Sequence, residues 1–172
     1  MKSFFKKLFS KHKKFTLITE EERIFLLNWI QSKENKFIPN QVSPNRKYFP
    51  FESSNDADDH LYLLSDIKNR IVKKEKIKNY ISDPLIGDFI SWITNNGRIH
   101  AHKDCCEIGK LVRYNLAVSL PDVGGRPIYD GELIDLKEKE CVRCDCTSIH
   151  ETEVVVGNKP RIVVSFGFLI FE

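Results

Sequence analysis

The chain lacks any continuous apolar stretch that approaches the ~20 residues of a membrane-spanning helix. Its first 15 residues contain lysines and phenylalanines, but no apolar core and no small-residue cleavage site typical of a secretory signal. Apolar residues make up 41% of the 172 residues, which is ordinary for a globular protein. These features predict a cytoplasmic protein without an integral membrane segment, large enough for one domain with its own core.

Acidic residues are missing from the first 14 positions, which carry six lysines. The remainder holds 21 Lys and Arg against 24 Asp and Glu, so the body of the protein is slightly acidic and a nucleic-acid partner is not expected. We therefore divide the chain into a basic tail (1–15) and a single domain (16–172). The apolar residues of the tail fit one face of a short helix, so a membrane-surface or nucleic-acid arm is the alternative to a solubilising tail.

Cysteines are few and odd in number, unlike the even, spaced set of a secreted disulfide framework, and they fit a reducing compartment. The five are Cys105, Cys106, Cys141, Cys144 and Cys146. The last three precede His150, which raises the alternative of a zinc site. In a strand, however, Cys141 faces away from Cys144 and Cys146, and no Gly, Pro or Asn between them supplies a turn.

The first half of the chain predicts two helices separated by a long loop. Thr19 and Glu22 have the spacing of a capping box, and the apolar residues behind them continue a helix to about Ser32. A second helix is expected from about Asp59 to Val72, and the alternative is that the charged stretch from Lys73 to Lys78 extends it. The segment 35–58 contains three prolines and a polar run, which predict a long loop of the kind that often forms a lid or substrate wall.

From residue 87 onward the hydrophobic pattern changes to the period of two that is typical of β-strands. The expected strands are 88–93, 98–102, 112–120, one that opens at 124, 140–149, and a closing hairpin of 154–156 with 161–171. Two helices followed by about seven or eight short strands predict a mainly β (α+β) fold, a double-stranded β-helix or jelly roll. The helical support covers 16–86, packed outside one sheet, and the jelly-roll core covers 87–172.

A set of possible metal ligands lies in the β-rich half. His102 and Asp104 are two residues apart, and His150 follows 46 residues after Asp104. Two histidines and one carboxylate hold Fe(II) on one face and leave its other positions open for oxygen and a co-substrate. His-x-Asp alone is a weak signal, but the distant histidine and then Arg161 make an ordered set. His100 shares the face of His102, and we expect it either to support the site or to be a half-buried histidine.

Two arginines share strand faces with small polar residues, Arg161 with Ser165 and Arg113 with Asn115. A buried arginine needs an anionic partner, because an uncompensated charge in an apolar interior is costly. For Arg161 a keto acid offers a carboxylate that the guanidinium binds at two points, and the alternative is a salt bridge with Asp or Glu. For Arg113 both alternatives remain open.

The segments that carry a family resemblance are 99–104, 113–115, 121–129, 150–153 and 161–168. Together they resemble the Fe(II)/2-oxoglutarate-dependent dioxygenase superfamily, and within it a virus- and microbe-type subgroup related to prolyl and aspartyl/asparaginyl hydroxylases. The resemblance covers residues 99–170 and implies the jelly-roll fold. The helical first half fits the layout of the subgroup with less distinctive residues.

The resemblance also implies roles for individual residues. It assigns the iron ligands to His102, Asp104 and His150. It assigns the distal carboxylate of 2-oxoglutarate to Arg161, helped by Ser165. Co-substrate contacts near the metal fall to Asn115, Arg113 and Tyr114.

The activity implied is the hydroxylation of an amino-acid, peptide or other small-molecule substrate, with release of succinate and CO2 from 2-oxoglutarate. The cofactors are Fe(II), 2-oxoglutarate as co-substrate and O2, with ascorbate as a reductant. Because Asp104 is present, a halogenase is disfavoured. Demethylases of nucleic-acid bases carry a second arginine downstream of the first, and residues 162–172 contain none.

Two alternatives to an oxygenase remain. One is a cupin-like module that binds a metal or ligand without catalysis, and the other is a catalytically silent protein with the same fold. Arg161 separates the first from an oxygenase, because such a module has no need of a buried arginine aimed at a keto acid. The substrate and the oligomeric state are left open.

Overall fold

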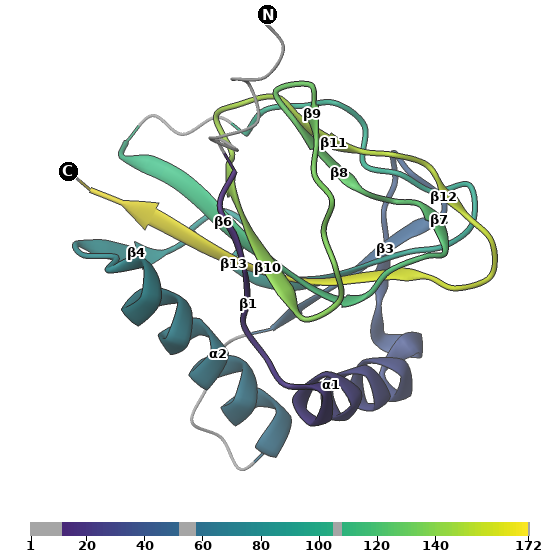
Figure 1. Ribbon diagram of the computed structural model, residues 1–172, viewed down its shortest axis with the longest axis horizontal. Helices are drawn as coiled ribbons and strands as arrows, with labels where there is room; N and C mark the ends of the chain where they lie inside the picture. Colours follow the sequence, from purple (N-terminus) through teal and green to yellow (C-terminus); the bar gives the residue numbers. More distant parts are fainter. Residues whose placement is uncertain (1–11, 52–57, 105–107, 172) are drawn as a thin grey trace, which may run out of the picture.

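The computed structural model describes residues 12–51, 58–104 and 108–171. Within them, a large antiparallel sheet has two helices on one face and two small sheets on the other (Figure 1). The strands of the large sheet are β1 (Lys14–Thr16), β2 (Ile38–Pro39), β3 (Arg46–Phe51), β4 (Tyr80–Ser82), β5 (Asp88–Ile93), β6 (Lys110–Ser119), β10 (Glu140–Asp145) and β13 (Arg161–Ile170). This is the mainly β jelly roll with helices outside one sheet that the sequence predicts.

The order of strands in the large sheet is β1-β10-β6-β13-β5-β3-β2, and β4 pairs with β13. One small sheet contains β11 (His150–Thr152), β8 (Pro127–Tyr129) and β9 (Glu132–Leu133) in that order. The other pairs β12 (Val155–Val156) with β7 (Val123–Gly124). Strands β1 to β4 precede residue 86, so the N-terminal half adds strands to the large sheet as well as helices.

The helices begin where their capping residues predict. In α1 (Glu20–Ser32) the Thr19 hydroxyl accepts from the Glu22 amide at 3.2 Å, and the Glu22 carboxylate accepts from the Thr19 amide at 2.9 Å. The predicted capping box is therefore confirmed. Helix α2 (Asp59–Glu75) begins behind Asp58, whose carboxylate accepts from the His60 amide, and it continues past Val72 into the charged stretch that was its alternative extension.

Strand β13 separates two different interiors. Residues 161–169 are all buried, so both faces of this strand are covered. Ile162, Val164, Phe166 and Phe168 pack with the helices in the larger hydrophobic core. The intervening residues face the small sheets, which places Arg161, Val163 and Ser165 on the wall of a pocket.

The expected long loop at 35–58 is wrong in part, because it contains a 3₁₀ turn (Glu34–Lys36), β2 and β3. Strand β3 pairs with β5 from Arg46 opposite Ile93 to Phe51 opposite Asp88. Pro50 is tolerated because it lies beyond the short strand β2, where β3 is the edge of the sheet and needs no second set of hydrogen bonds. Residues 52–57 lie outside the described part of the chain.

Two other strand predictions are also corrected. The segment 98–102 is not a strand, and His102 makes only an isolated bridge with His150. The closing hairpin is absent, because β12 pairs with β7, whereas β13 pairs with β4, β5 and β6. Close backbone approach explains the pairing of β12: Gly124 has a φ of 73°, and a Cβ there would lie 1.9 Å from the Val154 oxygen.

At the N-terminus the described structure includes the end of the predicted tail. Lys14–Thr16 forms β1, which pairs with β10, and the buried ring of His12 packs edge-on against Tyr129 with ring centroids 5.0 Å apart. The part of the basic tail at residues 1–11 lies outside the described residues. No helix in the described part of the chain is long and apolar enough to cross a membrane.

Candidate metal centre and co-substrate pocket

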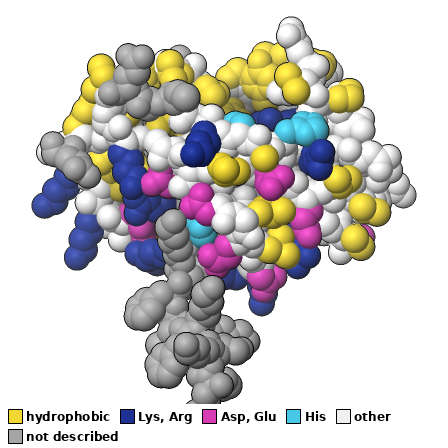
Figure 2. Space-filling model, turned by 90° about the horizontal axis from the view of Figure 1, so that it is seen from above, with side chains coloured by type: hydrophobic (Ala, Val, Ile, Leu, Met, Phe, Trp, Pro, Cys, Tyr) yellow, Lys and Arg dark blue, Asp and Glu magenta, His cyan; other side chains and the backbone are white. Residues whose placement is uncertain are grey.

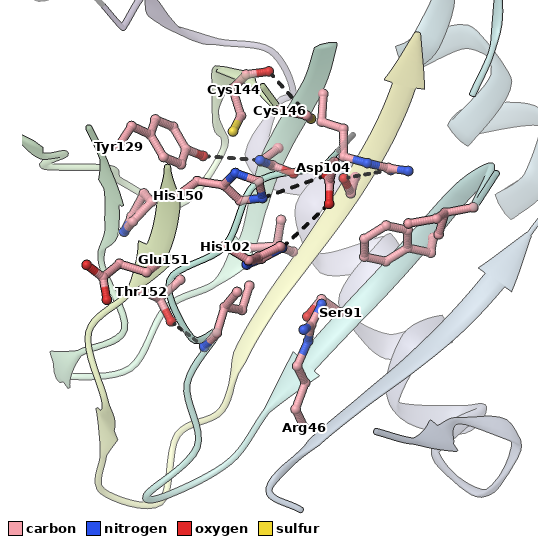
Figure 3. A pocket seen from close by; sticks show the side chains of 18 of the residues that line it. Arg46, Ser91, His102, Asp104, Tyr129, Cys144, Cys146, His150, Glu151 and Thr152 are labelled. Carbon is pink, nitrogen blue, oxygen red and sulfur yellow. Dashed lines mark hydrogen bonds and ion pairs between the residues drawn. The ribbon is translucent and has the colours of Figure 1, made fainter. Parts of the chain in front are cut away.

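His102, Asp104 and His150 converge at the mouth of the pocket (Figure 3). One Asp104 oxygen lies 3.7 Å from His102 Nε2, and the other lies 3.8 Å from His150 Nε2. One possible ligand atom from each side chain lies within 4.8 Å of the other two. Among the described residues this is the only such group of His, Cys, Asp and Glu, so the structure brings together the three residues that the sequence singled out.

Backbone contacts orient both imidazoles. His102 Nδ1 lies 2.7 Å from the His100 carbonyl oxygen, and His150 Nδ1 lies 3.0 Å from that of Ser148. Because a carbonyl oxygen only accepts, each Nδ1 carries the proton and each Nε2 is left with its lone pair beside Asp104. Burial lowers the pKa of His150, and His102 lowers it further, which favours the neutral form that binds a metal.

This donor set fits a ferrous ion. Two imidazole nitrogens and one carboxylate oxygen, all on one side of a common point, match the facial arrangement that leaves open positions for other ligands. His100 itself is exposed, and in the described structure it contributes its backbone carbonyl rather than its ring to the site. Its expected supporting role is therefore carried by the main chain.

The pocket lies between the inner face of the large sheet and the small sheet of β8 and β11, and it is partly open to solvent. Figure 2 views the face opposite the helices, where histidine and basic side chains lie together in a hollow flanked by hydrophobic side chains. Four of the five predicted co-substrate residues line the pocket: Arg113, Asn115, Arg161 and Ser165.

Arg161 is 3% exposed, and its Nε donates to the Gly125 carbonyl at 2.8 Å. It makes no ion pair with any carboxylate that the structure describes, so the salt-bridge alternative is not seen there. Burial lowers the pKa of Arg161 to about 10, which still leaves the guanidinium charged at neutral pH. The wall of the pocket therefore contains a buried cation, the Arg161 guanidinium, whose remaining N–H groups are free to bind a ligand.

Arg113 differs from Arg161, because its guanidinium already has partners within the protein. It forms a buried ion pair with Asp83, and its Nη1 donates to the Gly87 carbonyl at 3.1 Å and to the Ser165 hydroxyl at 3.3 Å. Of the two alternatives left open by the sequence, the structure shows the salt bridge. Arg113 still borders the pocket, where it orients the Ser165 hydroxyl.

Tyr114 is the predicted site residue that the structure does not bring to the pocket. It lies between Arg113 and Asn115 on β6, so the alternation of the strand turns its side chain to the helix face. There its ring packs edge-on against Phe168 at 5.6 Å, and its hydroxyl donates to Glu75 at 3.5 Å. The expectation of a co-substrate contact is corrected to a core position.

The pocket residues that were missed from the sequence include the polar residues Arg46, Ser91, Tyr129 and Thr152. Tyr129 lies opposite His150 in the β8–β11 pair, and its hydroxyl accepts from Asn115 Nδ2 at 3.1 Å. Thr152 accepts from the Ile99 amide at 2.9 Å and so fixes the segment that leads to the metal ligands. The aromatic residues of 46–51 were a usable signal for a strand that contains Arg46, but Pro44 and Pro50 concealed it.

The cysteines do not form a zinc site within the described structure. Cys141 is buried in the helix-side core, whereas Cys144 and Cys146 face the pocket, which is the opposed orientation that the strand period predicts. All three are free thiols. Cys105 and Cys106 lie outside the described residues.

No family model matches the sequence, and no curated protein matches it. Solved structures do match. The chain is similar to HygX from Streptomyces hygroscopicus with nickel and 2-oxoglutarate bound (TM-score 0.72, 7% identity, 92% of this chain and 82% of that one). A prolyl hydroxylase from Trichoplax adhaerens, in complex with a hypoxia inducible factor peptide fragment, is similar at a TM-score of 0.72 and 11% identity (92% and 83% covered).

A third similar structure is the viral collagen prolyl hydroxylase from Paramecium Bursaria Chlorella virus-1 (TM-score 0.64, 14% identity, 92% of this chain and 96% of that one). At these identities the likeness establishes the fold. The chain therefore has the jelly-roll fold of the 2-oxoglutarate-dependent oxygenases, including those of the prolyl hydroxylase type.

Proposed function

We propose that this protein is an Fe(II)- and 2-oxoglutarate-dependent oxygenase that hydroxylates an amino-acid, peptide or other small-molecule substrate. The observation that carries the proposal is the presence, in one pocket, of the His102, Asp104 and His150 group and of Arg161, a buried arginine without an ion-pair partner in the described structure. A metal site requires only the group of His102, Asp104 and His150. A site for a keto acid also requires a cation, which Arg161 supplies.

The similar structures support the proposal without deciding the activity. HygX was solved with nickel and 2-oxoglutarate, and the viral prolyl hydroxylase was solved as a 2-oxoglutarate complex. The other molecules bound in these structures differ, since HygX was also solved with hygromycin B and the Trichoplax prolyl hydroxylase with a peptide fragment. Their shared architecture therefore supports the class of chemistry more than any one substrate.

The residues of the chain have distinct tasks in the proposed reaction. His102, Asp104 and His150 hold the metal, with their orientation set by the backbone of residues 100 and 148. Arg161 receives the distal carboxylate of 2-oxoglutarate through a charge-assisted, two-point contact. When bound, iron, 2-oxoglutarate and oxygen supply the oxidising chemistry, and 2-oxoglutarate leaves as succinate and CO2.

The pocket walls support this arrangement. The Ser165 hydroxyl accepts from Arg113 Nη1, so its own proton is free to point toward a carboxylate held by Arg161. Asn115 is held by the Tyr129 hydroxyl, which leaves the amide oxygen and a second N–H for the co-substrate. Phe89 and Val163 supply apolar surface that limits water around the charged groups.

We also infer the setting of the enzyme, from its composition and from the family resemblance. The substrate is a small molecule or peptide, the compartment is the cytoplasm, and ascorbate serves as a reductant. Nucleic acid is not expected as a partner, because residues 15–172 carry an excess of acidic side chains.

A turnover assay tests the proposal. Full-length protein with Fe(II), 2-oxoglutarate and oxygen should release succinate, and an Asp104→Ala variant of equal thermal stability should not. Wild-type protein that binds the metal but neither binds 2-oxoglutarate nor forms succinate would instead support the cupin-like, non-catalytic module. The arginine in the pocket is the reason that we rank that module second.

A further inference from the structure

A second arginine of the pocket, Arg46, lies in the same row of the large sheet as Arg161. Arg46 on β3 is opposite Ile93 on β5, and Ile93 is opposite Arg161 on β13. Residues directly opposite one another in a sheet project from the same face, so both arginines face the small sheets and the pocket. In Figure 3 the Arg46 side chain extends toward Ser91, from the side opposite to Tyr129.

Arg46 and Ser91 have unsatisfied polar atoms. Arg46 Nε and Ser91 Oγ are buried, and neither has a hydrogen-bond partner among the described residues. Arg46 also makes no ion pair with a described carboxylate, whereas Arg113 is paired with Asp83. Buried polar groups are nearly always hydrogen-bonded, and leaving one unpaired costs ~1–3 kcal/mol, so two unpaired donors on one pocket wall indicate a binding position.

The backbone holds Arg46 in place, so its position is built into the fold. Its amide donates to the Ser43 carbonyl at 2.9 Å, and its carbonyl accepts from the Asn40 amide at 2.8 Å. Just before Arg46, the Asn45 carbonyl accepts from the amide of Thr94, the residue that follows β5, at 2.9 Å. A side chain projecting from so constrained a backbone is suited to specific recognition, because little ordering remains to be done on binding.

Arg46 also stands where the pocket meets a shallower groove on the surface. The groove is bordered by residues 40–43 and 98–102, and it shares Arg46, Ile99 and His102 with the deeper pocket. Arg98 adds a second positive charge to the groove, and no carboxylate lines it among the described residues. A substrate that reaches the metal centre through this groove therefore passes two arginines.

In the loaded pocket no anion is left to offset the charge of Arg46 at close range. A divalent ion and Arg161 together offset Asp104 and the two carboxylates of 2-oxoglutarate, which leaves the charge of Arg46. Glu151, the other acid on the pocket wall, points away from Arg46, beyond His102 (Figure 3). Burial lowers the pKa of Arg46, whereas the Asp104 carboxylate opposes that shift, so Arg46 lies within electrostatic range of the metal site.

We propose that Arg46, assisted by Ser91, binds a carboxylate of the substrate and so makes this oxygenase selective for carboxylate-bearing amino acids, either free or within a peptide. The proposal rests on the proposed function, which supplies the metal and the co-substrate. The unpaired Nε belongs to the edge of the guanidinium that binds a planar carboxylate at two points, and a serine hydroxyl adds a third donor. The acidic body of the chain disfavours the phosphates of a nucleic acid as the anion.

The test compares full-length wild-type protein with Arg46→Gln and Lys47→Gln, each loaded with Mn(II) and saturated with 2-oxoglutarate without oxygen. Lys47→Gln is the matched control, because it removes one positive charge from the next residue of β3, whose side chain faces Glu34 and Trp92 on the other side of the sheet. The probes are the free amino acids and short acidic peptides, each alongside its carboxamide, and a methylated oligonucleotide. Calorimetry measures their binding.

In wild-type protein and Lys47→Gln, the best carboxylate probe should bind about 10- to 100-fold more tightly than its carboxamide, the loss expected for a charge-assisted pair. Arg46→Gln should abolish the difference in affinity between the carboxylate and its carboxamide, and Arg46→Lys should keep part of it. Both Arg46 variants should bind 2-oxoglutarate with the affinity of the wild type. Free amino acids and peptides are separate arms, so the arm that shows the difference identifies the form of the substrate.

Several results would overturn the proposal. Weaker 2-oxoglutarate binding by Arg46→Gln would place Arg46 in the co-substrate site, and equal binding of all carboxylates and amides by wild type would remove its role in recognition. Tighter binding of the oligonucleotide than of any amino acid or peptide would assign the cation to phosphate. If wild-type protein does not bind 2-oxoglutarate, the proposed function fails, and the same comparison with Mn(II) alone then decides the role of Arg46 separately.

Discussion

His102 and His150 are joined by two backbone hydrogen bonds, from the His102 amide to the His150 carbonyl at 3.2 Å and from the His150 amide to the His102 carbonyl at 2.9 Å. This isolated bridge joins the segment that follows β5 to the start of β11. It sets the spacing of the two imidazoles before any ion is bound. The Asp104 amide is held in turn by the Cys146 carbonyl at 2.8 Å, so all three candidate ligands are positioned by the main chain.

The metal site is tested by His150→Ala. Removal of one of three ligands should weaken binding of Fe(II), Mn(II) or Co(II) at least tenfold, as measured by equilibrium dialysis with metal analysis, whereas wild type binds about one ion per chain. His100→Ala is the matched control, because its backbone carbonyl remains. Full metal occupancy of the His150→Ala variant would contradict the assignment.

The co-substrate site is tested by Arg161→Ala. The loss of a charge-assisted, two-point contact costs ~1.5–3 kcal/mol or more, so the requirement for 2-oxoglutarate should rise by about one to three orders of magnitude. Metal binding should barely change. An unaltered affinity for 2-oxoglutarate would make Arg161 a structural residue.

Adjacent residues of β6 should behave differently. Asn115→Ala should weaken 2-oxoglutarate binding, because the amide faces the pocket beside Tyr129. Tyr114→Phe should leave that affinity within about twofold, because the ring faces the helices and loses only its contact with Glu75. Titration of both variants by calorimetry checks this, and the reverse order of effects would show that the register of β6 is wrong.

The Arg113–Asp83 pair should matter for stability. Asp83→Ala leaves a buried guanidinium uncompensated and should lower the free energy of unfolding by ~3–5 kcal/mol. Replacement of both residues, Arg113→Met with Asp83→Ala, should cost less than the sum of the single changes. Urea unfolding of the four proteins completes the cycle, and strictly additive effects would show that the two side chains do not interact.

The nature of the substrate is tested by product analysis. With Fe(II) and 2-oxoglutarate, pools of amino acids and peptides should yield a product that has gained one oxygen, and methylated oligonucleotides should remain unchanged. Demethylation that is lost on deletion of residues 1–11 would make the basic tail a docking arm for nucleic acid. The deletion should stop at residue 11, because Lys14 already belongs to β1.

Signals in the sequence were sufficient to predict the helices and to single out the three residues that the structure brings together. A capping box acts within one turn, so Thr19 and Glu22 located the start of α1. The period of two placed Arg161 and Ser165 on one face of β13, and the residue types of His102, Asp104 and His150 indicated a metal site. None of these inferences required knowledge of which strands are neighbours.

The tertiary structure alone decided what depends on pairing between distant segments. Strand β3 was concealed by prolines and exists because β5 pairs with it, which brings Arg46 into the pocket. The segment 98–102 has the alternation of a strand, but within it only His102 forms a β-bridge, with His150. The ion pair of Arg113 with Asp83 connects β6 with the loop that follows β4. The sequence contains no local signal of that contact.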